Sequence, residues 1–341
     1  NKHNLSCNKC SKYNPNTKAN KSFNKKQINL KGDNYLYVQR MMKCRVLIGL
    51  IVAYFTYAHG ATMNCQPYEP SDVQACTWGT SERMKIQWAD QNCPAGWAYA
   101  VSSAVEMLYA EHDVTFPDFV SAQQLIDCNE LSASYNTCGP NYGASGKRSD
   151  FAVGGLKYIR DKYFMCTASV YPVTGHIQHC QDTICDPSKP GTVVLNVDVQ
   201  TKYLHNPEEL VELLKQSPGG VIMSIDTSSM GDYVHGDGAM GMGDVVPGEN
   251  YLCSSVSPAI FQDVLVIGFI YQASTGKGEI IFKNSWGVNW GEFHPFFTPE
   301  QVSRFQRGYG RVKISRNYDY NNERRNPCRI FPGYATYPVL K

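Results

Sequence analysis

Two short segments of this 341-residue chain carry the side chains best suited to covalent chemistry. Residues 91–100 read Q-N-C-P-A-G-W-A-Y-A and contain one thiol, that of Cys93, whereas residues 281–287 read I-F-K-N-S-W-G and offer the amide of Asn284. Covalent catalysis by a side chain needs a thiolate or an activated hydroxyl, and a base that removes the proton. The question these segments raise is therefore whether a thiolate of this chain can attack a carbonyl.

Residues 91–100 resemble the Q-x-x-C-G-S-C-W-A-F segment of the papain-like cysteine proteases, in which the second cysteine, directly before the tryptophan, is the nucleophile. Gly96 stands at that place here, and glycine has no side chain that could ionise or attack a carbonyl. The resemblance implies that Gln91 is the oxyanion-hole residue and that Cys93 forms a disulfide. An alternative register makes Cys93 the nucleophile, but it separates the thiol from Trp97 and removes that disulfide.

The base of the family is also replaced. Residues 261–269, F-Q-D-V-L-V-I-G-F, resemble the family's D-H-x-V-L-V-V-G-Y, and this register places Gln262 where the family has its histidine. A glutamine amide is neutral and cannot remove a proton from a thiol, whereas imidazole titrates near neutrality. The resemblance implies that Asn284, which orients the histidine in the family, is retained and that Trp286 shields it. We therefore expect a hydrogen bond between the amides of Gln262 and Asn284.

The predicted substrate cleft departs from the family as well. Residues 138–141 read C-G-P-N where the family reads C-N-G-G, whose last glycine lets a substrate backbone approach. Pro140 and Asn141 add bulk and restrict this loop, so the resemblance implies an altered cleft between them and Trp286. His235 and His294 lie in or beside loop insertions, which leaves a relocated active site as an alternative.

Cysteine usage indicates an oxidising compartment. Ten of the 13 cysteines follow residue 60, an even number that suits five disulfides. The resemblance implies the pairs Cys93–Cys138, Cys128–Cys180 and Cys253–Cys328. The sequence leaves open how four others pair, namely Cys65, Cys76, Cys166 and Cys185. The alternative use of these residue types is a zinc site made of His176, His179, Cys180 and Cys185; our prediction is no metal and no cofactor.

The first 60 residues differ from the rest. Residues 1–40 are rich in Asn, Lys and Ser and are predicted to be disordered or a translated upstream region, and residues 41–60 have the charged start and apolar run of a signal peptide. A membrane anchor is the alternative, although the run is short for a bilayer. From residue 61 onward there are 21 basic and 29 acidic residues, a net charge of −8. No basic stripe with interleaved aromatics is present, so we expect no nucleic-acid partner.

The resemblance covers residues 82–341 and implies an α+β, papain-like fold stabilised by disulfides. We expect an N-terminal extension at residues 61–81, a left, helical subdomain at residues 82–195, and a right, antiparallel β-barrel-like subdomain at residues 196–341, with a cleft between the subdomains. Apolar residues recur at helical spacing in residues 98–112, whereas residues 218–226 read as a turn into a buried strand.

The function expected from these residues is that of a secreted, catalytically inactive protease homologue, a pseudoprotease that acts by binding or as a decoy. It would be a monomer with protein partners, such as protease inhibitors or host proteins, and without a membrane after signal cleavage. Inactivated relatives of the mite group-one allergens are one subgroup that it resembles. The alternatives are an active cysteine endopeptidase that uses Cys93 and a purely structural or storage role. A disulfide between Cys93 and Cys138 would discriminate against the active enzyme.

Overall fold

The computed structural model describes residues 63–68, 70–79, 93, 95–114, 116–131, 138, 148–227, 230, 260–293, 296, 308–317 and 327–341. These residues belong to one compact unit, Gly60–Lys341. The predicted leader segments 1–40 and 41–60 lie outside the described residues, as do Gln91, Pro140, Asn141, His235, Cys253 and His294. Among the described residues, no helix is long and apolar enough to cross a membrane.

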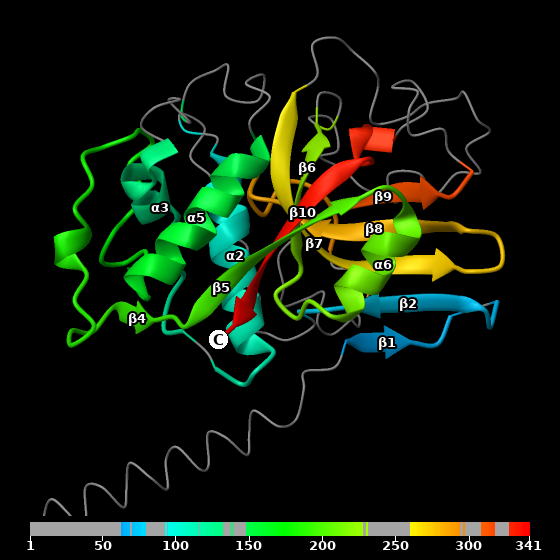
Figure 1. Cartoon of the computed structure of the whole chain (residues 1–341), viewed down its shortest axis with the longest axis horizontal. Helices are drawn as coiled ribbons and strands as arrows, with labels where there is room; N and C mark the ends of the chain where they lie inside the picture. Colours follow the sequence, from blue (N-terminus) through cyan, green and yellow to red (C-terminus); the bar gives the residue numbers. More distant parts are fainter. Residues whose placement is uncertain are drawn as a thin grey trace, which may run out of the picture. The chain divides into compact units, whose positions relative to one another are not determined.

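Three helices gather on one side of the unit (Figure 1). They are α2 (Gly96–Ala110), α3 (Ala122–Cys128) and α5 (Arg148–Lys162), and α2 packs against both others. Helix α2 is buried along almost its whole length because its residues are small or apolar, as the spacing in residues 98–112 predicts. Helix α3 begins where the Ser121 side chain accepts a hydrogen bond from the Gln124 backbone N–H at 3.0 Å.

Helix α5 runs without a break through Gly154 and Gly155, although two adjacent glycines favour an interruption. A Cβ atom on Gly155 would lie 3.0 Å from the Trp97 ring of α2, and one on Gly154 would lie 3.0 Å from the Asn129 side chain. The glycines therefore let α5 approach α2 and the end of α3 closely, and this packing offsets their poor helix propensity.

The rest of the unit is built on an eight-stranded antiparallel sheet. In Figure 1 most of its strands lie to the right, while β5 and β10 run down toward the helices. Its order is β1-β2-β7-β6-β10-β5, and β8 pairs with both β7 and β9. The strands are β1 (Asn64–Gln66), β2 (Val73–Thr77), β5 (Val197–Leu204), β6 (Val221–Asp226), β7 (Phe261–Gln272), β8 (Lys277–Lys283), β9 (Tyr309–Ser315) and β10 (Gly333–Leu340).

A separate two-stranded sheet joins β3 (Phe164–Cys166) to β4 (Thr192–Val194). The short helices η2 (Asp182–Ile184) and η3 (Pro327–Arg329) lie in connections. Helix α6 (Pro207–Lys215) packs against β7 and β5. The sequence N-P-E-E at residues 206–209 predicts a helix start, because it offers a capping side chain, then proline, then acids in the first turn. The structure confirms this start, since Asn206 accepts from the Glu209 backbone N–H at 3.0 Å and proline occupies the first turn.

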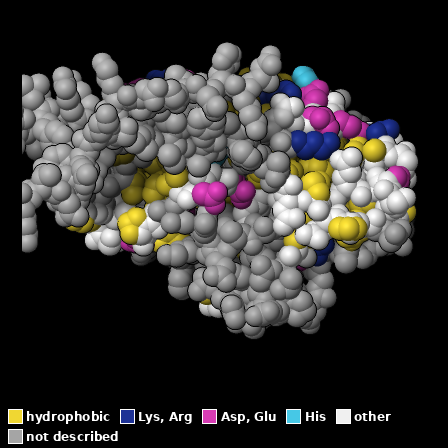
Figure 2. Space-filling model, turned by 90° about the horizontal axis from the view of Figure 1, so that it is seen from below, with side chains coloured by type: hydrophobic (Ala, Val, Ile, Leu, Met, Phe, Trp, Pro, Cys, Tyr) yellow, Lys and Arg dark blue, Asp and Glu magenta, His cyan; other side chains and the backbone are white. Residues whose placement is uncertain are grey.

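Two hydrophobic cores hold these elements together. The first lies between the helices and the sheet and centres on Trp97, whose side chain is fully buried; the second lies among β6, β7, β8 and β9 beneath α6. Part of the predicted extension at residues 61–81 belongs to this architecture, because β2 pairs with β7 from Val73↔Gln272 to Thr77↔Gly268. Figure 2, which views the unit from below, shows hydrophobic side chains in separate patches, acidic side chains near the middle, and charged side chains of both signs at the upper right.

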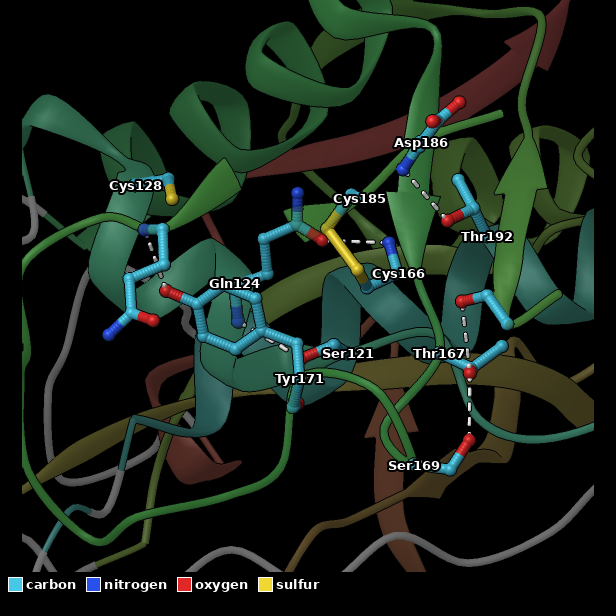
Figure 3. Close-up of a disulfide and its surroundings, with 12 residues drawn as sticks. Ser121, Gln124, Cys128, Cys166, Thr167, Ser169, Tyr171, Cys185, Asp186 and Thr192 are labelled. Atoms are coloured by element: carbon cyan, nitrogen blue, oxygen red, sulfur yellow. Dashed lines mark hydrogen bonds between the residues drawn. A yellow bond between two sulfur atoms is a disulfide. The ribbon is translucent and has the colours of Figure 1, made fainter. Parts of the chain in front are cut away.

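The connection from β3 to β4 is held by two disulfides, Cys128–Cys180 and Cys166–Cys185. Figure 3 shows the second of these beside Gln124, whose Oε1 accepts a hydrogen bond from the Cys166 backbone N–H at 2.8 Å. Ser121 donates to the carbonyl of Tyr171 at 2.7 Å, and Thr192 accepts from the Asp186 backbone N–H at 3.1 Å. The connection is thereby tied to α3 at one end and to β4 at the other.

Removal of the Cys166–Cys185 disulfide is expected to destabilise the protein. A variant with alanine at both positions should lose about 3 kcal/mol of unfolding free energy, because the bridge spans 19 residues and its removal frees the unfolded chain. Urea unfolding of the variant and the parent protein measures the loss. Lys189→Ala is the matched control, since it removes an exposed ion pair with Asp186 from the same connection. A loss no larger than that of the control would contradict the prediction.

Candidate functional site

Gly96 is the first residue of α2, which follows the buried Ala95. A Cβ atom added to Gly96 would come within 2.9 Å of three atoms of Gln262, its Cγ, Cδ and Nε2. Cβ atoms do not come this close to other atoms, so any larger residue at position 96 would force the Gln262 side chain to move. The two positions that the sequence singles out are therefore in direct contact.

Gln262 enters the site as the second residue of β7, where it pairs with Ile225 of β6. Its Nε2 donates to Asn284 Oδ1 at 2.7 Å and approaches Ser285 Oγ at 3.4 Å, and its Oε1 accepts from Trp286 Nε1 at 2.7 Å. The predicted hydrogen bond between the two amides is thus present. Because both ends of the buried amide have partners, Gln262 is held in one orientation.

Asn284 follows directly after β8 and is 4% exposed. Its Oδ1 also accepts from the Ser285 backbone N–H at 2.8 Å, whereas its Nδ2 is buried without a hydrogen-bond partner in the described structure. Trp286 was expected to shield the contact between Gln262 and Asn284. Its indole N–H also donates a hydrogen bond to Gln262 and fixes that side chain. The Trp286 ring also packs edge-on against Trp290, with ring centroids 5.1 Å apart.

Cys93 is bonded to Cys138 and is 1% exposed, so in this structure it carries no thiol. The Cys128–Cys180 pair implied by the resemblance is also confirmed. Cys328 is disulfide-bonded, and its expected partner, Cys253, lies outside the described residues. The four cysteines left open by the sequence form the pairs Cys65–Cys76 and Cys166–Cys185.

These disulfides bear on the alternative zinc site. Cys180 and Cys185 each use their sulfur in a disulfide, whereas zinc is bound by thiolates. The alternative zinc site of His176, His179, Cys180 and Cys185 is therefore wrong. Within the described ranges, no group of three or more His, Cys, Asp or Glu side chains lies close enough together to hold a metal ion.

A buried lysine beside Gly96 and Asn284 was not predicted from the sequence. Lys283 Nζ donates to Ser103 Oγ of α2 at 2.9 Å, and both residues are 4% exposed. A cavity of about 10 Å³, roughly the space that one water molecule needs, is lined by both of them together with Gly96, Asn284 and other residues. Strand periodicity could have revealed Lys283, because it shares a face of β8 with the buried Ile281.

Burial lowers the pKa of Lys283 to about 8, against the opposing influence of the nearby Glu106 carboxylate. In the unfolded chain this pKa returns to the ordinary lysine value of 10.5. Between these two values the unfolded chain binds a proton that the folded protein has released, so stability rises with pH. The rise amounts to about 3 kcal/mol in total, because each pKa unit is worth about 1.4 kcal/mol.

Lys283→Met should remove this rise. Urea unfolding of both proteins from pH 7 to pH 10 is expected to show the parent gaining stability relative to the variant as the pH increases. Lys215→Met, which alters a surface ion pair with Glu212, is the matched control and should follow the parent curve. Parallel curves for Lys283→Met and the parent would contradict the assignment.

The groups hydrogen-bonded to Gln262 beside Gly96 are neutral, namely those of Asn284, Ser285 and Trp286, while Lys283 and Asp263 line the adjacent cavity. In a papain-like site an imidazole would occupy the place of Gln262 and a thiol would project from the place of Gly96. An amide neither takes up a proton near neutral pH nor attacks a carbonyl. The described residues are therefore suited to holding a fixed, buried hydrogen-bonded arrangement at the start of α2.

Comparisons with known proteins agree with this architecture. The family model described as papain family cysteine protease matches residues 70–309. A viral cathepsin of Lymantria dispar multicapsid nuclear polyhedrosis virus is 26% identical over 235 residues, which cover 64% of this chain and 55% of that protein. Digestive cysteine proteinase 3 of Homarus americanus is 26% identical over 247 residues, which cover 72% of this chain and 62% of that protein.

A crystal structure of a Carica candamarcensis cysteine protease in complex with E-64 shares 20% sequence identity, with a TM-score of 0.49 over 76% of this chain and 94% of that one. The chain spans less than two thirds of the length of the viral cathepsin and of the lobster proteinase. The family match covers well over half of the chain and includes Gly96, Gln262 and Asn284. The chain belongs to the papain family of cysteine proteases and has the papain-like α+β fold.

Proposed function

We propose that this protein is a catalytically inactive member of the papain family that acts by binding. The observation that carries the proposal is the contact between Gly96 and Gln262, in which the side chain at the base position fills the space of the missing nucleophile. Gln262 is also fixed by Asn284 and Trp286, so the contact is part of a packed and hydrogen-bonded arrangement.

The catalytic parts that remain cannot compensate for those that are replaced. Gln91 would supply the oxyanion hole, but this hole stabilises a charge that forms only after a nucleophile has attacked. Asn284 would orient a histidine, but position 262 holds a glutamine. An endopeptidase that uses Cys93 would need a free thiolate, and the disulfide with Cys138 together with an exposure of 1% argues against it.

Secretion is the second part of the proposal. Among the described residues, eight cysteines form four disulfides, a pattern that persists in oxidising compartments. Residues 41–60, with their charged start and apolar run, would direct export and be removed. The partner would be a protein that recognises papain-like folds, such as a protease inhibitor or a host protein, and the protein would act on it as a monomeric decoy.

The experiment combines a chemical and a binding measurement on the purified chain. Intact mass is recorded before and after incubation with E-64, a thiol-directed epoxide, without reductant, and hydrolysis of fluorogenic peptides is followed in parallel. We expect no adduct and no hydrolysis above that of the heated protein. A single adduct on Cys93 would overturn the inactive assignment.

Binding is then measured by calorimetry with a protein inhibitor of papain-like proteases. We expect one inhibitor per chain and weaker binding for Trp286→Ala, because this substitution releases Gln262 beside the predicted cleft. Arg160→Ala, which removes a partly exposed arginine in the last turn of α5, is the control and should bind as the parent does. Absence of binding in the parent would reject the decoy role and favour a structural or storage role.

A further inference from the structure

The disulfide between Cys65 and Cys76 differs from the other described disulfides in its exposure to solvent. Cys65 is exposed, whereas five other bridged cysteines, Cys76, Cys93, Cys166, Cys185 and Cys328, are at most 4% exposed. The remaining three, Cys128, Cys138 and Cys180, are half-buried. Attack on a disulfide requires a thiolate to reach one of its sulfur atoms, so Cys65 offers the most accessible target among them.

The strand that Cys65 belongs to is weakly attached. Strand β1 has three residues, all exposed, and within the part of the chain that the structure describes its strand partner is β2, at the end of the sheet order. The disulfide joins Cys65 to the residue directly opposite, Cys76, which is part of the core beneath α6. Met63 is half-buried against both cores and is the other apolar anchor next to this strand. Two-stranded pairing of this length is marginal by itself, so the disulfide is a principal attachment of β1.

We propose that Cys65 is a thiol-exchange site that accepts low-molecular-weight thiols and that its modification releases β1 from the sheet. The thiolate of the incoming molecule attacks Cys65 Sγ, the bond to Cys76 Sγ breaks, and a mixed disulfide forms on Cys65. Cys76 leaves as a thiolate and takes up the proton lost by the incoming thiol. This step needs no external oxidant or reductant, because one disulfide replaces another.

Release of β1 changes the edge of the sheet. In the disulfide-bonded protein β1 covers one edge of β2, and β7 covers the other. After exchange, the backbone N–H and C=O groups that β2 directs toward β1 become an open strand edge, which can pair with another extended segment. The exchange would therefore convert a closed edge, on the lower side of the sheet in Figure 1, into an open one.

The test uses the purified, fully oxidised chain and reduced glutathione as the probe. Samples are quenched with acid at intervals, alkylated and analysed by peptide mass spectrometry. We expect a glutathione adduct on Cys65 and an alkylated Cys76 to form at least about tenfold faster than modification of any other described cysteine, because reaching a buried sulfur requires more extensive opening. Earlier or equal modification of another cysteine would overturn the proposal.

A variant with serine at both Cys65 and Cys76 is the control and should take up no glutathione over the same period. Amide hydrogen exchange at residues 64–66 provides the second measurement. In the parent protein, exchange there should rise after glutathione treatment to the rate found in the double-serine variant, while exchange in α2 stays unchanged. An adduct on Cys65 without faster exchange at residues 64–66 would overturn the release of β1.

Discussion

Gly96→Cys and Gln262→His, combined in one molecule, are expected to create a reactive thiol, whereas either substitution alone is not. Asn284 Oδ1 already accepts a hydrogen bond at 2.7 Å from the side-chain nitrogen at position 262. A histidine ring that keeps this bond through one nitrogen would direct the other toward the start of α2, where the introduced thiol stands. A positioned base accelerates proton removal by about 10² to 10⁴-fold, so the double variant should exceed Gly96→Cys by such a factor.

The measurement is the rate of labelling by E-64 near neutral pH, followed by hydrolysis of a small fluorogenic peptide. Gly96→Cys alone is the matched control, since it carries the same new thiol without a base. Asn284→Ala in the double variant should reduce the rate by freeing the histidine ring. Equal labelling rates for the single and the double variant would show that the geometry at the start of α2 no longer supports the family's chemistry.

Gly96→Cys should also lower stability when Gln262 is retained. The new Cβ atom would lie 2.9 Å from Gln262, which can move only by giving up its bonds to Asn284 and Trp286. Overpacking of this kind costs about 1 to 3 kcal/mol. Urea unfolding measures this loss of stability in Gly96→Cys without any substrate. It is therefore independent of the labelling and hydrolysis rates.

Arg311→Met is expected to cause the largest loss of stability among the substitutions considered. Arg311 donates to Glu279 at 2.9 Å and to both carboxylate oxygens of Glu292, at 2.7 and 2.9 Å, and all three side chains are at most 14% exposed. Without the guanidinium, two carboxylates remain buried together, and breaking a buried ion pair in this way costs about 3 to 5 kcal/mol.

The loss should depend on pH. Burial raises the pKa of Glu279 even in the presence of Arg311, which acts in the opposite direction. In Arg311→Met the arginine no longer lowers the pKa of Glu279, so the pKa of this carboxyl in the folded protein lies further above its value in the unfolded chain. The stability of the variant is therefore higher at low pH and falls as the pH rises. Urea unfolding at pH 4.5 and pH 7 should therefore show the smaller loss at the lower pH.

Two further variants make the Arg311 result specific. Arg311→Met combined with Glu279→Gln and Glu292→Gln should recover much of the loss, because no buried charge remains without a partner. Arg316→Met, which removes an exposed arginine bound to Glu208, should have a much smaller effect. A loss for Arg311→Met that is equal at both pH values would contradict the role of the buried carboxylates.

Much of the fold followed from motifs that depend on local sequence. The N-terminal cap of α6 at Asn206 and the pairs Cys93–Cys138 and Cys128–Cys180 were predicted correctly. The contact between Gln262 and Asn284 also followed from the register of two conspicuous segments. The cap could be predicted because it is set by a few residues at fixed spacing, whereas the disulfide pairs and the contact between the amides were implied by the resemblance to the papain-like proteases.

Other features depend on contacts between segments that are far apart in the chain, and they could not be predicted from the local sequence. The pairing of Cys65 with Cys76 requires the register of β1 on β2, and the unbroken helix α5 requires the close approach of Trp97 to Gly155. The contact between Gln262 and Gly96 could not be predicted for the same reason, since it depends on how β7 packs against α2. Sequence motifs identify such residues but do not predict the distances between their side chains.

The two bridges around the connection from β3 to β4 also bear on how the protein withstands digestion. Cys128–Cys180 and Cys166–Cys185 each join a residue before position 167 to one after position 179, so both span any backbone cut between those positions. A nick there would leave one covalent molecule, which electrophoresis would resolve as a single band without reductant and as two bands with it. The fold could thus lose a peptide bond to a neighbouring protease and still keep both fragments in place.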